Sequence, residues 1–128
     1  MGIRASGGRL GTKYRGAPTI LLTTKGRHSG KDRTVPLLAV PVGQGYAVTG
    51  SNGGHDRPPD WYRNLVANPD VRVQVGRRSF AASARVVAGP ERDALYERFV
   101  AVLPTYHQYE EATSRVIPVV LIEPVQMP

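Results

Sequence analysis

Short apolar runs, each closed by glycine, proline or a charged turn, succeed one another along the first half of this chain. The runs 19–24 and 34–42 flank a basic loop, and Tyr46–Thr49 is a third run. The first run lacks strict alternation, which predicts a strand buried on both faces. The second contains Pro36 and Pro41, and because proline cannot donate to a ladder, it predicts an edge strand or a bulge near Pro36.

The second half mixes helical and strand patterns. Pro58-Pro59-Asp60 is typical of a helix start, and the helix 60–67 should end at Asn68-Pro69. Val71–Val75 alternates, with three valines on one face, and a turn leads into a longer strand, Ser79–Val87.

The remaining pattern predicts two helices and a last strand. Apolar residues recur at helical spacing between Gly89 and Pro104. A short helix, Tyr106–Thr113, places Tyr106 and Tyr109 on one side, and 117–123 is a buried strand. Six strands with few, short helices do not alternate as βαβ units. We therefore expect a mainly β, α+β fold, a small antiparallel barrel with flanking helices.

Composition limits the classes of protein that fit. The chain has 128 residues, no cysteine and a net charge of +7, so it predicts one domain (17–128) and an anionic partner. The glycine-rich basic segment 1–16 is expected to be flexible. No run is long enough for a membrane helix and no signal peptide is evident, which favours the cytoplasm, with peripheral contact with anionic membranes as an alternative.

Two loops carry the candidate chemistry. The first holds Arg27, His28, Ser29 and Arg33 in a loop with two glycines, so that guanidinium groups and backbone amides can converge on a phosphate or carboxylate. The second, 51–54, leads to a helix carrying Trp61 and Tyr62. Together they predict a pocket for a flat, anionic ligand. A solvated hairpin and a tryptophan that only packs the core are the plain alternatives.

Other chemistries have weaker signals. The three histidines are far apart and lack metal-ligand spacing, so we expect no metal site. Ser51 lacks the context of a nucleophile elbow, which argues against a hydrolase.

Four ordered motifs then identify a family resemblance. They are Gly26–Gly30 with Arg33 and Pro36-Leu37, Ser51–Gly54, Pro59–Leu65 with Asn68-Pro69, and Thr113–Val120. From about Gly8 to Pro124 the chain resembles the deazaflavin-dependent nitroreductase family. The resemblance implies a split β-barrel like that of FMN-binding proteins, and coenzyme F420, a 5-deazaflavin with a phosphodiester and an oligoglutamate tail, as cofactor.

The resemblance also implies roles for individual residues. The phosphate and tail would contact Arg27, His28, Ser29 and Arg33. One side of the ring would be lined by Thr34, Val35, Pro36, Leu37 and Leu38. The other side would be bordered by Thr49, Gly50, Ser51, Asn52, Asp60, Trp61, Tyr62, Arg63 and Asn64. Ser51 would lie at the reacting end, Tyr106 would cover the substrate side, and Tyr106 or Tyr109 would supply a proton.

The implied reaction is hydride transfer from reduced F420 to an electron-poor quinone, enone or nitro compound, with the Ser51 hydroxyl stabilising charge on the acceptor oxygen. This chain has His28 and Asn52 where nitroimidazole-reducing members often have lysine, and Leu38 and Leu103 where they have tyrosine. These differences leave the acceptor open.

Three other interpretations stay open at this stage. One is an F420 carrier without turnover, and another is a flavoprotein that uses FMN. The third is a small basic barrel that binds nucleic acid through residues such as Arg72, Arg77 and Arg78, although the low aromatic content of 7% argues against base stacking. The small-molecule acceptor is the expected partner, and the chain is expected to be a monomer or a weak homodimer.

Overall fold

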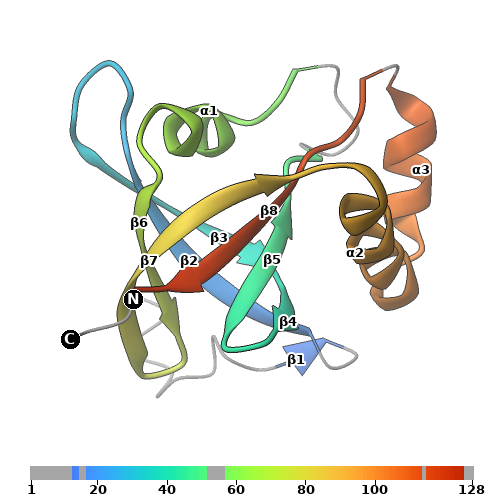
Figure 1. Ribbon diagram of the computed structural model, residues 1–128, viewed down its shortest axis with the longest axis horizontal. Helices are drawn as coiled ribbons and strands as arrows, with labels where there is room; N and C mark the ends of the chain where they lie inside the picture. The colour runs from blue at the N-terminus through green and yellow to red at the C-terminus, as the bar shows by residue number, and fades with distance from the viewer. Residues whose placement is uncertain (1–12, 15–16, 52–56, 114, 126–128) are drawn as a thin grey trace.

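The computed structural model describes residues 13–14, 17–51, 57–113 and 115–125, which form one curled antiparallel sheet with three helices around it (Figure 1). The strands are β1 (Lys13–Tyr14), β2 (Ala17–Lys25), β3 (Asp32–Leu38), β4 (Val40–Val42), β5 (Gly45–Thr49), β6 (Asp70–Val75), β7 (Arg78–Val87) and β8 (Val119–Pro124). The helices are α1 (Asp60–Ala67), α2 (Gly89–Val102) and α3 (Thr105–Ala112).

The sheet closes on itself through the β3–β4 segment. Its order is β1-β2-β6-β7-β8-β5-β4, with β3 paired to β2. Only Ala39 separates β3 from β4, so a nearly continuous strand runs from the β2 edge to the β5 edge. Along 32–38 the only described partner is β2, which confirms that the proline-containing run is an edge strand. The result is a split β-barrel, open beside β3.

The expectation that β2 is buried on both faces is wrong. Ile20, Leu22 and Thr24 are at most 1% exposed, whereas the alternate residues Leu21 and Thr23 are only half-buried. The face with Ile20, Leu22 and Thr24 packs inside the barrel, whereas Leu21 and Thr23 line an open hollow on the outer face of the sheet. Apolar and β-branched side chains on a half-buried face hid the two-residue period.

Part of the segment expected to be flexible forms a strand. Lys13–Tyr14 is β1, which pairs with Ala17 and Pro18 at the start of β2. The rest of 1–16 lies outside the described residues, as does Asn52.

Two apolar clusters fix the helices on the barrel. The interior cluster includes Ile20, Val48 and Ile122, and Trp61 and Leu65 of α1 pack into it. A second cluster lies between the outer face of β5 and β8 and the helices α2 and α3. Strands β5 and β8 are therefore covered on both faces, which places the end of β5 between α1 and α3. Among the described residues, no helix is long and apolar enough to cross a membrane.

Candidate functional site

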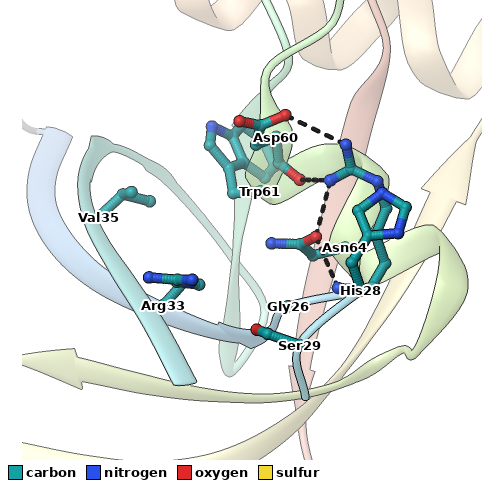
Figure 2. Close-up of a pocket in the computed structure, with 9 residues that line it drawn as sticks. Gly26, His28, Ser29, Arg33, Val35, Asp60, Trp61 and Asn64 are labelled. Carbon is teal, nitrogen blue, oxygen red and sulfur yellow. Dashed lines mark hydrogen bonds and ion pairs between the residues drawn. The ribbon is translucent and has the colours of Figure 1, made fainter. Parts of the chain in front are cut away.

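A cleft of about 410 Å³ opens between β3, helix α1 and the loop that joins β2 to β3 (Figure 2). Arg33 and Val35 project from β3, and His28 stands across the cleft from them. The full lining is Gly26, Arg27, His28, Ser29, Arg33, Val35, Asp60, Trp61 and Asn64.

The β2–β3 loop is tight because two glycines allow it. The Gly26 amide donates to the Lys31 carbonyl at 2.8 Å, and the Gly30 amide donates to the Gly26 carbonyl at 2.8 Å. Gly30 has φ 72°, in the left-handed region. A Cβ on Gly26 would lie 2.7 Å from Ser29 Oγ, so a side chain there would push Ser29 away. The loop thus presents a compact, exposed group of donors at the mouth of the cleft.

Arg27 is fastened to helix α1 from both its backbone and its side chain. Its amide and its Nη1 donate to Asn64 Oδ1 at 3.1 and 2.9 Å. Its Nη2 lies 3.3 Å from Asp60 Oδ1. Asn64 is 4% exposed and its Nδ2 donates to the buried Thr24 hydroxyl at 3.3 Å. Asn64 therefore joins α1, β2 and the loop into one rigid wall.

The charges of the cleft suit an anion. Arg33 is exposed on β3, and among the described residues no carboxylate is paired with it. The Asp60 carboxylate also lines the cleft, but Arg27 pairs with it. A guanidinium, a hydroxyl and an imidazole thus face the opening, while Val35 and Trp61 give one apolar wall. This donor set fits a phosphate or carboxylate attached to a flat ring.

A second group of polar side chains lies at the end of β5. Thr49, Ser51 and Tyr106 are 7%, 8% and 9% exposed. Thr49 Oγ1 lies 3.5 Å from Ser51 Oγ, and Tyr106 hydrogen-bonds to the Thr49 side chain. Burial raises the pKa of Tyr106, and the Thr49 hydrogen bond opposes that shift only in part. These three residues form the hydroxyl cluster.

Helix α3 is held over the hydroxyl cluster by aromatic contacts. The Tyr96 hydroxyl of α2 donates to the Tyr106 carbonyl at 2.6 Å. The Tyr106 ring lies edge-on to Phe99 and to Tyr109, with centroids 5.4 and 5.3 Å away. The prediction that Tyr106 and Tyr109 share one side of their helix is confirmed.

The structure divides the residues named from the sequence between these two places. Eight line the cleft: Arg27, His28, Ser29, Arg33, Val35, Asp60, Trp61 and Asn64. The hydroxyl cluster consists of Thr49, Ser51 and Tyr106. Gly50 joins Thr49 to Ser51 in the chain. Tyr109 contacts only the edge of that cluster, through the Tyr106 ring.

Other named residues lie elsewhere. The side-chain oxygens of Thr34 and Thr23 are hydrogen-bonded at 2.7 Å, and both residues line a hollow on the outer face of the sheet. Pro36 is exposed, and Leu37 packs against the interior cluster. Leu38 packs against the outer cluster.

The rest of α1 faces partly away from the cleft. Tyr62 packs against the interior cluster and Arg63 is half-buried.

Among the described residues, no group of three or more histidine, aspartate or glutamate side chains is arranged to hold a metal ion.

Sequence reasoning missed three residues that organise the site. The sequence pattern shows Gly26 only as a turn residue and Thr24 only as part of a strand. Arg115 belongs to one of the motifs that carry the family resemblance, but the sequence alone indicates no role for it. Its Nη2 donates to the carbonyls of Gly50 and Ser51 at 2.8 and 3.0 Å. No local pattern shows that contact, because more than sixty residues separate the partners.

Comparison with known proteins agrees with this geometry. The family model for F420H(2)-dependent quinone reductases matches residues 2–124. An F420H(2)-dependent quinone reductase of Mycobacterium tuberculosis H37Rv is 38% identical over 125 residues, covering 93% of this chain and 83% of the relative. The solved structure of an F420H2-dependent reductase, FDR-A, is 41% identical with a TM-score of 0.77, covering 83% of this chain and 94% of that one.

A further solved structure, described as a domain-swapped dimer, is also 41% identical with a TM-score of 0.77, covering 83% of this chain and 80% of that one. The fold and the site therefore define a split-barrel reductase that depends on a deazaflavin. The chain belongs to the F420H(2)-dependent quinone reductase family. The expected family, enzyme class and cofactor are confirmed, and FMN use, nucleic-acid binding and a carrier role are not favoured.

Proposed function

We propose that this protein reduces quinones with F420H2, binding the cofactor between the cleft and the hydroxyl cluster. The observation that carries the proposal is the pairing of an anion-binding cleft beside β3 with three buried hydroxyl groups at the end of β5. The cleft suits an anionic tail, and the hydroxyl cluster suits a reacting oxygen. The family match over residues 2–124 supports the same cofactor and acceptor class.

Different residues of the cleft would contact different parts of the cofactor. Arg33, His28 and Ser29 would hold the phosphate or tail, while Val35 and Trp61 would contact the ring. Arg27 would act partly through its bonds to Asn64, which set the position of the whole loop. When bound in reduced form, F420 supplies a hydride from C5 of its deazaflavin ring.

The hydroxyl cluster would stabilise the acceptor. A quinone that receives a hydride develops negative charge on oxygen, and a preorganised donor in a site shielded from water stabilises that charge. Ser51, only 8% exposed, is the donor we assign. Tyr106 keeps its proton at neutral pH, since the ordinary pKa of 10.0 is already well above 7 and burial raises it further, so it would donate a hydrogen bond and cover the acceptor.

We also propose an assembly and a location for the protein. A 41% identical structure is described as a domain-swapped dimer, which supports a weak homodimer of this chain alongside the monomer. The location that we propose is cytoplasmic, with the acceptor taken from the membrane surface where lipid-soluble quinones reside. Enones and nitro compounds stay as alternative acceptors.

The test is steady-state oxidation of F420H2 by a water-soluble quinone, followed by recovery of F420 fluorescence. Ser51→Ala should lower kcat by about 100-fold, as expected for loss of one oxyanion donor, while the Kd for F420 changes less than twofold. Ser83→Ala, an exposed serine on β7, is the matched control and should behave as wild type. No oxidation by quinone, enone or nitro acceptors would overturn the proposed function, and unchanged kcat in Ser51→Ala would remove Ser51 from it.

A further inference from the structure

Arg115 reaches from the segment before β8 to the far end of β5. Its Nη2 donates to the Gly50 carbonyl at 2.8 Å and to the Ser51 carbonyl at 3.0 Å. The same nitrogen lies 3.5 Å from the Arg57 carbonyl, just ahead of helix α1. One guanidinium therefore ties the end of β5 to the start of α1, the two elements that flank the proposed reacting end.

Gly50 is fixed on its other side as well. Its amide donates to the Pro118 carbonyl at 2.9 Å, so its N–H and its C=O are both held. A Cβ at this position would lie 2.8 Å from Pro118 Cγ, so glycine is needed for this close approach. The backbone that leads into Ser51 thus has little freedom to rotate.

The peptide bond that joins Gly50 to Ser51 links the held carbonyl to the direction of the Ser51 amide. No cis peptide bond occurs among the described residues, so the peptide joining Gly50 to Ser51 is trans and planar. Its N–H therefore points opposite to the carbonyl that Arg115 holds. A guanidinium on the carbonyl oxygen also polarises the amide and strengthens its N–H as a donor. Arg115 thus sets both the direction and the strength of the Ser51 amide.

We propose that Arg115 is a positioning residue for the reduction: it holds the carbonyls of Gly50 and Ser51, and thereby aims the Ser51 amide and hydroxyl at the acceptor oxygen. This inference rests on the proposed function. Arg115 does not touch the reacting atoms in this account, since it acts through Ser51.

The test compares Arg115→Gln with a matched arginine. Arg98 makes the same kind of contact elsewhere, donating from Nη2 to the Pro41 carbonyl at 2.8 Å at an exposed position. Arg115→Gln should lower kcat by about tenfold or more with a Kd for F420 within twofold of wild type, and Arg98→Gln should change neither. Arg115→Lys, which keeps one charged donor, should recover part of the loss.

A double-mutant comparison separates positioning from general damage. In a Ser51→Ala background, Arg115→Gln should change kcat less than about twofold, because the group that Arg115 positions is already gone. A loss of equal size in both backgrounds, or wild-type kcat in Arg115→Gln, would overturn the proposal.

A readout without turnover makes the result independent of the proposed function. In ¹H–¹⁵N spectra of the cofactor-free protein, the Ser51 amide resonance should move in Arg115→Gln and Arg115→Lys but stay in place in Arg98→Gln. An unmoved Ser51 resonance would overturn the positioning role even in a folded variant. If wild type oxidises no F420H2 while the resonance does move, the proposed function fails and the contact stands.

Discussion

The side-chain oxygen of Asn64 accepts two hydrogen bonds from Arg27, one from its amide at 3.1 Å and one from its guanidinium at 2.9 Å. The same amide group donates to Thr24 inside the barrel. A single buried side chain on α1 therefore sets the conformation of the basic loop. The anion-binding wall is rigid before any ligand arrives, which lowers the entropy cost of binding.

Asn64→Ala should damage both the fold and the cleft. It removes three hydrogen bonds, and within the described part of the chain these include the bonds of the buried Thr24 hydroxyl and of the Arg27 amide. We expect a loss of about 1–3 kcal/mol in the free energy of unfolding, measured by urea denaturation. The Kd for F420 should rise severalfold, because the loop is no longer held in one conformation.

Asn68→Ala is the matched control for that variant. The Asn68 side chain also accepts one backbone hydrogen bond, from the Asp70 amide at 3.1 Å, but it does not line the cleft. It should lower the unfolding free energy by about 1 kcal/mol and leave the Kd for F420 unchanged. If both asparagine variants bind F420 as tightly as wild type, the organising role of Asn64 in the cleft is wrong.

Arg33→Gln should weaken cofactor binding in a salt-dependent way. An exposed ionic contact contributes about 0.2–1 kcal/mol, so the Kd for F420 should rise by roughly 1.5- to 5-fold at low salt. The difference from wild type should shrink as added salt screens the charge. Arg77→Gln, an exposed arginine on the β6–β7 turn, carries the same change in net charge away from the cleft. An equal effect from both variants would show that net charge, and not the cleft, attracts the cofactor.

Alkaline pH should destabilise the fold through its buried tyrosines. Burial raises the pKa of Tyr96 and of Tyr106 above the ordinary value of 10.0. Above about pH 10 the unfolded chain releases phenolic protons that the folded protein retains, so the free energy of unfolding falls as pH rises. Each retained proton contributes a slope of about 1.4 kcal/mol per pH unit up to the folded pKa, and nothing below pH 9. Urea denaturation between pH 8 and 11.5 measures this slope.

Tyr96→Phe isolates the contribution of one tyrosine. It removes the hydroxyl that donates to the Tyr106 carbonyl, so it should be less stable at neutral pH by about 1 kcal/mol. Its unfolding free energy should nevertheless fall less steeply than that of wild type above pH 10, since lysines titrate alike in both proteins. Parallel pH curves would contradict the raised pKa of Tyr96.

Elements that depend on local pattern could be predicted from the sequence. Pro59 and Asp60 mark the start of α1, and the helix ends at Asn68, whose amide donates to the Asn64 carbonyl. The β6–β7 hairpin follows from the valine alternation and the turn at Gly76, which has φ 57°. These signals lie within a few residues of the structure that they specify.

Contacts between distant segments could not be predicted in the same way. Arg92 is 8% exposed and donates twice to the Ile117 carbonyl, yet on a helix full of charges it looks like a surface residue. Arg115 and Asn64 likewise act on partners from other elements. Nor does the sequence show that the named site residues fall into a cleft and a separate hydroxyl cluster, because that division depends on which strands and helices lie side by side in the fold.

A titration of Trp61 fluorescence with F420 tests whether the cleft beside β3 binds the deazaflavin. Trp61 is the only tryptophan of the chain, it is 8% exposed, and it lines the cleft. We expect saturable quenching by F420 at micromolar concentration, weaker at high salt, with little response to FMN. Quenching by FMN that equals or exceeds that of F420, or no response to F420 at all, would contradict the assignment of the cleft as a deazaflavin site.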